Sequence, residues 1–398
     1  TPKPISIPFV MFNQAARHTA MLAMFARLQQ RYGCELAALC DGARVEELHL
    51  PTSASTSTSN SLTRDAIHRL FTHQTLALVV RRFVEPAAAA QLAAQLAAHG
   101  TTTWRVANPS GRDHVAHDEG FETERVSSVG IPFTEALRDG DAGVRRYFDA
   151  ALPHMRLLRQ LSHPHPCPID KLRLELDELW PDGACVSHNK HGEPYAVGVA
   201  RLMQPVAMTL EHEHEHEHEQ PLPPLAGSAL VPSRQPYRDP QQQQQAREQA
   251  RVAQVLHHIQ GFCHVDDLSP IRGDRGLFSA NVYLQVPEPP PSSSSSSVEE
   301  WRRLGEGGLE VWDLRVSSRW DFYRNAVTLS MLLSEDERQQ AVLRAQLPPP
   351  HLIVPEPGDL VLLAAQRPHA VRGFRFGQRI TLQTFIQRNK RGPLMLDT

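Results

Sequence analysis

The chain has 398 residues, of which 41% are hydrophobic and 21% charged, with a formal net charge of -3. This composition is typical of a globular protein that buries a core of its own. The charge excludes the strongly basic surface that nucleic-acid-binding proteins use, and no apolar run approaches the ~18 residues needed to cross a bilayer. We therefore expect a small-molecule substrate, no nucleic acid and no membrane; the oligomeric state is left open.

The cysteines and the N-terminus bear on the compartment. The five cysteines include no CxxC pair, which disfavours a disulfide framework and a zinc ribbon and favours an intracellular, reducing compartment such as the cytoplasm. The first thirty residues contain Lys3, Arg17 and Arg27 but no acidic residue, as in the tail of an organelle transit peptide. An ordinary surface helix explains the same pattern, so a plastid or a mitochondrion stays open beside the cytoplasm.

Low-complexity stretches divide the chain. Residues 1–50 are predicted to be a helical segment and 51–64 a polar linker, so that the main domain covers 65–398. Within it, 209–245 and 287–298 are too poor in bulky apolar residues to offset their ordering entropy, and are predicted to be insertions.

The readable elements change character along the main domain. A strand-like run at 75–84 precedes a predicted helix, and further helical patterns follow to residue 161. From Tyr195 onward the sequence has short apolar runs separated by Gly, Pro and Asp, which is typical of a β sandwich or barrel. The sequence therefore predicts an α+β fold in which helices pack against a β barrel.

The most conspicuous metal-binding pattern is EHEHEHEHEQ, residues 211–220. As a strand it would place its histidines in a row on one face, and such a ladder can bind zinc, nickel or copper adventitiously. Nothing around it fixes one geometry or supplies supporting hydrogen bonds, so we expect it to be dispensable for function.

A second candidate metal site lies in the β half. GFCHVDDL places His264 and Asp266 two residues apart, so that on a strand both side chains point to one face. His369 follows a later strand and turn. Two histidines and one carboxylate on one side of a metal, with open positions opposite, is the arrangement of non-haem Fe(II) oxygenases.

Arg379 lies ten residues after His369, and its planar fork of donors suits a carboxylate. Thr381, two residues on, could donate a hydrogen bond to the same group. These residues resemble the motif of the Fe(II)/2-oxoglutarate-dependent oxygenases. The resemblance covers residues 70–398, because FSANVYLQVPE, GEGGLEVWDLRVSS, VPEPGDLVLLAAQRPHAV and RITLQTFIQ follow the strand order of that superfamily.

The resemblance implies a double-stranded β-helix core, the cupin-like jelly roll, with packed N-terminal helices. Within the superfamily the chain is similar to the freestanding radical halogenases of amino acids and alkaloids and to their hydroxylase relatives. The halogenases have Gly or Ala where this chain has Asp266, and the vacancy admits a halide to the iron. Hydroxylation or another oxidative C–H reaction is therefore implied here, and not halogenation.

The resemblance also implies the cofactors and the role of each residue. Fe(II) would be held by His264, Asp266 and His369, and 2-oxoglutarate and O2 would be consumed as succinate and CO2 are released. The implied reaction is hydroxylation of an unactivated C–H bond of a small molecule, such as a free amino acid or a derivative. The resemblance implies that Arg379 anchors the distal carboxylate of 2-oxoglutarate, and Thr381 shares its strand face. Strand parity alone adds Asn281 and Tyr283 as further contacts to 2-oxoglutarate, and Trp312 and Gln383 as contacts to substrate.

The sequence leaves two alternative functions open. The chain could be a protein or peptide side-chain hydroxylase of the same superfamily. It could also be a non-catalytic metal-binding jelly-roll protein in which the His/Glu and Gln tracts are the working parts.

Overall fold

The computed structural model describes residues 21–48 apart from 22 and 34, 62–107 apart from 104, 113–115, 126–206 apart from 139, 252, 255, 256, 259–289, and 295–398 apart from 335. No helix in these ranges is long and apolar enough to cross a membrane.

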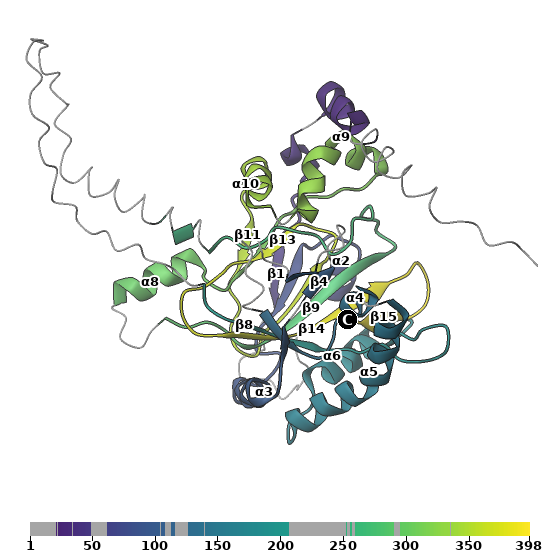
Figure 1. The fold of residues 1–398 in the computed structure, drawn as a ribbon, viewed down its shortest axis with the longest axis vertical. Helices are drawn as coiled ribbons and strands as arrows, with labels where there is room; N and C mark the ends of the chain where they lie inside the picture. The colour runs from purple at the N-terminus through teal and green to yellow at the C-terminus, as the bar shows by residue number, and fades with distance from the viewer. Residues whose placement is uncertain are drawn as a thin grey trace, which may run out of the picture.

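A large sheet forms the centre of the fold (Figure 1), with strands in the order β1-β2-β12-β9-β14-β8-β6-β3. β15 pairs with β14 and with β7, and the pairs β1/β2 and β7/β15 are parallel while the other neighbours are antiparallel. The strands are β1 (Val45–Leu48), β2 (Ala77–Val80), β3 (Thr102–Thr103), β6 (Val126–Val129), β7 (Ala184–Val186), β8 (Val199–Met203), β9 (Gly276–Gln285), β12 (Leu360–Ala364), β14 (Arg379–Arg388) and β15 (Leu394–Asp397).

A smaller sheet faces one side of the large one. Its order is β11-β10-β13, and β4 and β5 form a separate hairpin. These strands are β4 (Arg105–Ala107), β5 (Asp113–Val115), β10 (Leu309–Val311), β11 (His351–Ile353) and β13 (His369–Val371). One apolar cluster joins Val311 and Ile353 of the small sheet to Tyr283 and Val361 of the large one. The two sheets therefore share a core between their facing sides.

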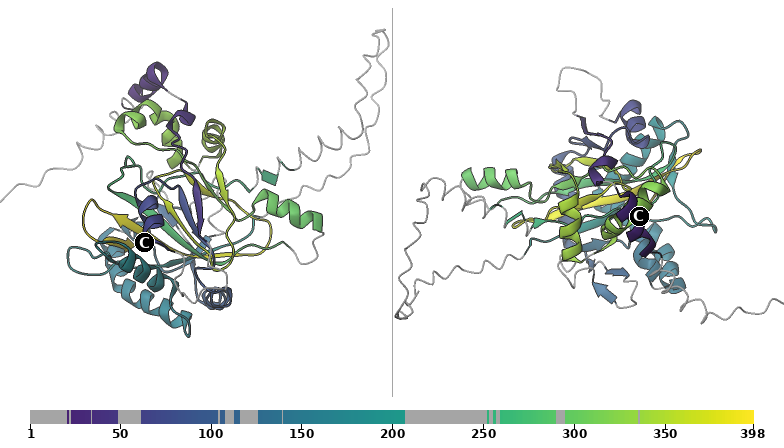
Figure 2. Two further views of the ribbon diagram at one scale, coloured as in Figure 1. Left: turned by 180° about the vertical axis from the view of Figure 1, so that it is seen from behind. Right: turned by 90° about the horizontal axis from the view of Figure 1, so that it is seen from above.

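Helices cover the opposite side of the large sheet, as Figures 1 and 2 show for α3, α5 and α6. These helices and their neighbours are α2 (Arg64–Phe71), α3 (Pro86–Ala98), α4 (Phe133–Arg138), α5 (Gly140–Ser162) and α6 (Pro168–Leu179). Successive side chains of a strand alternate between faces, so Phe278 and Val282 of β9 pack among the helices whereas Asn281 and Tyr283 point to the small sheet. The predicted mixed α+β fold is confirmed.

The N-terminal segment is not purely helical. Residues 21 and 23–32 are helical and lie beside α9 (Arg319–Leu329), and a 3-10 turn, η1 (Leu36–Leu39), follows. β1 then adds a parallel edge strand to the large sheet. The expected division at residue 50 is therefore incomplete, because the end of this segment belongs to the sheet.

One expected insertion also differs from the prediction. α8 (Ser295–Leu304) begins within 287–298, so the end of the serine tract is helical where a low-complexity insertion was expected. Valine, tryptophan and leucine at the end of this helix supply an apolar face that the serine run lacks. The insertion at 209–245 lies outside the described residues. The remaining elements are η3 (Ser330–Leu333) and α10 (Glu337–Gln346).

Candidate metal and carboxylate site

Three potential metal ligands meet where the GFCHVDDL segment pairs with the start of β13. The backbone N–H groups of His264 and His369 each donate to the carbonyl of the other, at 3.0 and 2.9 Å, and residues paired in this way point their side chains to the same face. The N–H of Asp266 donates to the carbonyl of Ala365 at 2.9 Å. One ligand atom of each side chain lies within 4.8 Å of the others, so His264, Asp266 and His369 come together and can hold a metal ion.

A glycine allows the motif to lie against β13. A Cβ atom on Gly261 would lie 1.7 Å from the carbonyl oxygen of Val371, a distance that no side chain tolerates. The glycine of the GFCHVDDL sequence is therefore required for the close approach that brings His264 beside His369.

Backbone carbonyls fix which imidazole nitrogen faces the metal position. His264 Nδ1 lies 3.0 Å from the carbonyl oxygen of Phe262, and His369 Nδ1 lies 2.9 Å from that of Arg367. A carbonyl can only accept, so each Nδ1 carries the hydrogen and donates it. Each Nε2 is left to offer its lone pair, and the outer hydrogen bond holds the ring in that orientation.

The carboxylate of Asp266 completes the donor set. Its oxygens lie 3.7 Å from His264 Nε2 and 3.3 Å from His369 Nε2. Burial acts to raise the pKa of Asp266, but His369 and His264 outweigh it and hold that pKa below its usual value. Burial lowers the pKa of His264 to about 4, so this imidazole is neutral at pH 7.

The pKa of His369 shifts in the opposite direction to that of His264. Burial favours its neutral form, but the charge and hydrogen bond of Asp266 together raise the pKa of His369 above its usual value. A metal ion must therefore compete with a proton for His369 Nε2. The site offers two imidazole nitrogens and one carboxylate oxygen, a set that binds non-haem iron and also zinc.

A buried arginine lies on the inner face of the large sheet. Arg379 is 4% exposed, and its guanidinium donates to the hydroxyl of Tyr283 at 3.1 Å and lies 3.0 Å from the sulfur of Met203. Its Nε is buried without a hydrogen-bond partner, and no carboxylate among the described residues pairs with it. A permanently charged group that is buried without an anion indicates a binding position for one.

Strand register places the other predicted 2-oxoglutarate residues on the same face as Arg379. Thr381 is opposite Tyr283, and Gln383 is opposite Asn281, in the pairing of β14 with β9. The side-chain amides of Asn281 and Gln383 both donate to the hydroxyl of Ser279, at 3.0 and 3.2 Å. These polar side chains form a row that faces the small sheet.

Trp312 lies elsewhere. It is 2% exposed and packs with Cys263 and Val265, whose side chains alternate with those of the metal ligands. Its Nε1 donates to the carbonyl of Pro348 at 2.8 Å. The structure thus places Trp312 behind the metal-ligand segment as a packing residue, and the expectation that it faces substrate is corrected accordingly.

Arg201 is a site residue that the sequence did not single out. It lies opposite Thr381 in the pairing of β14 with β8, and its charge lowers the pKa of both His264 and Asp266. The available signal was an arginine in the middle of the apolar run 199–203, where a strand that only packs would have another apolar residue.

The N-terminal segment supports the site through a buried ion pair. Arg367 is fully buried, and its two terminal nitrogens donate to the two carboxylate oxygens of Asp41 at 3.1 and 2.7 Å. The carbonyl of the same arginine accepts the hydrogen bond from His369 Nδ1. The residue that orients one ligand is thus anchored to a segment more than 300 positions earlier in the chain.

Replacing Asp41 with alanine is expected to lower the free energy of unfolding by about 3 kcal/mol, because it leaves the Arg367 guanidinium buried and unpaired. Urea denaturation measures this change. The control is Glu85→Ala, which breaks the ion pair of Arg82 with Glu85. These side chains are 57% and 67% exposed, so the free energy of unfolding should fall by less than about 1 kcal/mol. Equal losses in the two variants would contradict the role of the buried pair.

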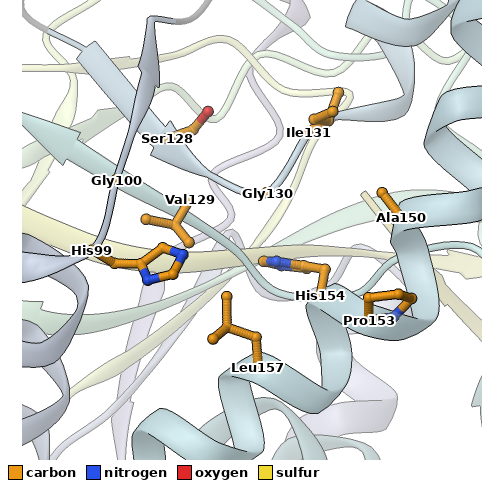
Figure 3. Close-up of a pocket in the computed structure, with 10 residues that line it drawn as sticks. All are labelled: His99, Gly100, Ser128, Val129, Gly130, Ile131, Ala150, Pro153, His154 and Leu157. Carbon is orange, nitrogen blue, oxygen red and sulfur yellow. The ribbon is translucent and has the colours of Figure 1, made fainter.

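A cavity of about 400 Å³ lies apart from these residues, between the end of α3, β6 and α5 (Figure 3). His99 and His154 line it together with Val129, Ile131 and Leu157. His154 Nε2 bonds the carbonyl of Gly198 at 3.0 Å, as a structural histidine does. The cavity contains none of the predicted site residues.

The alternating histidines at 211–220 lie outside the described residues. Deletion of 211–220 is expected to leave metal binding at the three ligands and turnover largely unchanged, because those ligands and their supporting carbonyls all come from other segments. Metal content after dialysis and turnover, compared between the deletion variant and the full chain, check this. Loss of the bound iron on deletion would contradict it.

No model of a known protein family matches the chain, and no curated protein matches it. Solved structures do match. An N-substituted L-amino acid dioxygenase from Burkholderia ambifaria has 13% identity and a TM-score of 0.43, over 87% of this chain and 95% of that one. Its complex with alpha-KG has a TM-score of 0.41, at 13% identity over 88% and 97% of the two chains.

Two further structures are similar to the chain. A Pseudomonas putida prolyl-4-hydroxylase has 13% identity and a TM-score of 0.29, over 83% of this chain and 98% of that one. HygX from Streptomyces hygroscopicus, with nickel and 2-oxoglutarate bound, has 12% identity and a TM-score of 0.35, over 82% and 87%.

Proposed function

We propose that this protein is a non-haem iron dioxygenase that uses 2-oxoglutarate and O2 to hydroxylate an unactivated C–H bond of a small molecule, releasing succinate and CO2. One observation carries the proposal: the fold combines a cluster of two imidazoles and one carboxylate with a buried, unpaired guanidinium on the facing sheet. A metal site alone would not need Arg379, and an anion site alone would not need the three ligands.

The arrangement of strands supports a double-stranded β-helix. β8, β14, β9 and β12 are neighbours in the large sheet, and β11, β10 and β13 form the sheet that faces it. The chain passes between the two sheets repeatedly, as the order of strand numbers in each sheet shows. This is how a jelly roll encloses a site between two layers.

The metal is assigned to His264 Nε2, His369 Nε2 and an oxygen of Asp266. Both histidines already have their outer nitrogens hydrogen-bonded, so the fit requires no change of tautomer. Iron bound there would supply oxygen activation coupled to the oxidative decarboxylation of 2-oxoglutarate. Asp266 fills the position that would otherwise admit a halide, which favours hydroxylation.

The distal carboxylate of 2-oxoglutarate is assigned to Arg379. Tyr283 accepts a hydrogen bond from this arginine, so its own O–H is free to donate to the same carboxylate. Thr381, opposite Tyr283 in the sheet, supplies its hydroxyl as a third contact. Asn281 and Gln383 extend the polar row and are proposed contacts to 2-oxoglutarate and substrate respectively. Each of these residues holds a reactant in place and keeps water from its position.

Substrate-stimulated succinate release tests the proposal. Free amino acids and their N-substituted derivatives are compared with peptides, each with Fe(II), 2-oxoglutarate and air, and with Fe(II) omitted as the control. We expect iron-dependent succinate that a small molecule stimulates. Stimulation by peptides alone would favour a side-chain hydroxylase, and no succinate with any member of the panel would argue for a non-catalytic protein.

A further inference from the structure

We propose that Asp397 binds the cationic group of the substrate, a primary ammonium or a guanidinium. This inference rests on the proposed function and adds the substrate class. It follows from where Asp397 lies, from what it contacts and from what it lacks.

Asp397 lies on the same face and at the same end of the large sheet as the metal ligands. The N–H of Asp266 donates to the carbonyl of Ala365, and the N–H of Ala365 donates to the carbonyl of Leu277. Leu277 is opposite Gln387 in β14, and the Gln387 side chain reaches Asp397 in β15, the strand next to β14 in Figure 1. Strands are spaced by about 4.8 Å, so this row of four strand spacings spans roughly 19 Å.

The inner face is identified by register. Asp397 is opposite Phe385 in the pairing of β14 with β15, and Phe385 is an even number of residues from Arg379 and Gln383 on the same strand. Side chains two residues apart in a strand share a face. Asp397 therefore faces the same space as the residues assigned to 2-oxoglutarate and substrate.

Only neutral groups contact the carboxylate. Ser187 Oγ donates to its Oδ2 at 3.1 Å, and Gln387 Nε2 donates to the same oxygen at 2.9 Å. Among the described residues no lysine, arginine or histidine forms an ion pair with Asp397, and none bonds to its Oδ1. Burial raises the pKa of this carboxyl to about 6, so the group is ionised at neutral pH but without a counter-charge.

Two tyrosines stand beside the carboxylate. The N–H of Tyr195 donates to the carbonyl of Ser187, whose own N–H donates to the carbonyl of Leu396. Burial is the main cause that raises the pKa of Tyr195 and of Tyr147, and the charge of Asp397 adds to it. The pKa of Tyr147 is raised to about 12. The Tyr147 hydroxyl lies 3.4 Å from Thr398 Oγ1, and the rings of both tyrosines pack with Phe133 and Phe148, so the proposed contact rests on the carboxylate alone.

The position also limits where oxidation occurs. The Asp397 backbone lies about four strand spacings from the Asp266 backbone, so the oxidised carbon is separated from the charged nitrogen by several bonds. An extended side chain such as that of lysine or arginine has this form.

Direct binding to the full chain tests the inference without relying on turnover. The protein is loaded with Zn(II) as a redox-inert ion and with 2-oxoglutarate, and is titrated calorimetrically with L-lysine and L-arginine. The neutral counterparts L-norleucine and L-citrulline are titrated in parallel. We expect each cationic probe to bind about 10-fold to 100-fold more tightly than its neutral counterpart, as a charge-assisted hydrogen bond in a partly buried position allows.

Three variants complete the design. Asp397→Asn keeps the shape and the hydrogen bonds but removes the charge, and should abolish the preference for cations. Asp397→Glu should restore part of it, and the exposed Glu299→Gln should leave it unchanged. Equal binding of charged and neutral probes to the wild type, no binding by any probe, or an undiminished preference in Asp397→Asn would each overturn the inference. Failure of 2-oxoglutarate itself to bind the metal-loaded protein would instead contradict the proposed function.

Discussion

Replacing His369 with alanine is expected to weaken metal binding at least about 100-fold and to abolish turnover. This loss is a lower bound, because mutation of residues that merely support a metal ligand already costs about 10-fold to 100-fold in affinity. His369 Nε2 is one of three converging ligand atoms, and its loss leaves only the two side chains of the HxD motif. Titration with Co(II), followed by its visible absorption, measures the affinity.

Two further variants make that result interpretable. Asp266→Ala removes a ligand whose backbone keeps its hydrogen bond to Ala365, so it should lose metal in the same way if the fold is intact. His68→Ala removes an exposed histidine of α2 and should leave the affinity unchanged. Normal metal affinity in His369→Ala and Asp266→Ala would show that iron binds elsewhere.

Replacing Arg379 with glutamine is expected to raise the KM for 2-oxoglutarate about 100-fold, which corresponds to about 2.7 kcal/mol. Glutamine retains a donor but not the positive charge, and the loss of a buried charge-assisted contact has this size. Metal affinity should be unaffected, because Arg379 contacts Tyr283 and Met203 and not the three ligands. Steady-state kinetics at varied 2-oxoglutarate, with Co(II) titration in parallel, separate the two effects.

The matched comparisons for this variant are Arg379→Lys and Arg391→Gln. Lysine keeps the charge but not the planar fork, so it should recover only part of the lost affinity. Arg391 is exposed on the turn before β15, and its replacement should change nothing. An unchanged KM in Arg379→Gln would mean that another group, such as Arg201, anchors the co-substrate.

Much of the site followed from spacing in the sequence, because strand geometry is local. The two-residue spacings of His264 and Asp266 and of Arg379 and Thr381 each predict a shared face. The ligand atoms of the first pair converge, and the unbroken pairing of β14 with β8 gives the second pair a common face. The meeting of His264 with His369 needed a non-local argument. It came from the resemblance and not from any local pattern.

Physical reasons explain the residues and the strand that were wrongly predicted or missed. In β10, Leu309 and Val311 face the core between the sheets, so Trp312 points the other way, but the sequence does not say which face of a strand is the inner one. β1 was not predicted because its sequence, VEEL, has two adjacent glutamates in place of an apolar run. Charged side chains are common on edge strands, and β1 is one. Asp397 and Arg201 were missed because one charged residue does not change the periodic pattern of an apolar strand. For Arg201 the signal was its place inside an apolar run.

The central claim is that one site binds both iron and 2-oxoglutarate. Its most direct test is the anaerobic visible spectrum of the protein with Fe(II), with 2-oxoglutarate, and with both. We expect a weak charge-transfer band only when both are present, absent in His264→Ala and shifted to higher 2-oxoglutarate concentrations in Arg379→Gln. No band in the wild type at saturating concentrations of both, or an equal band in His264→Ala, would contradict it.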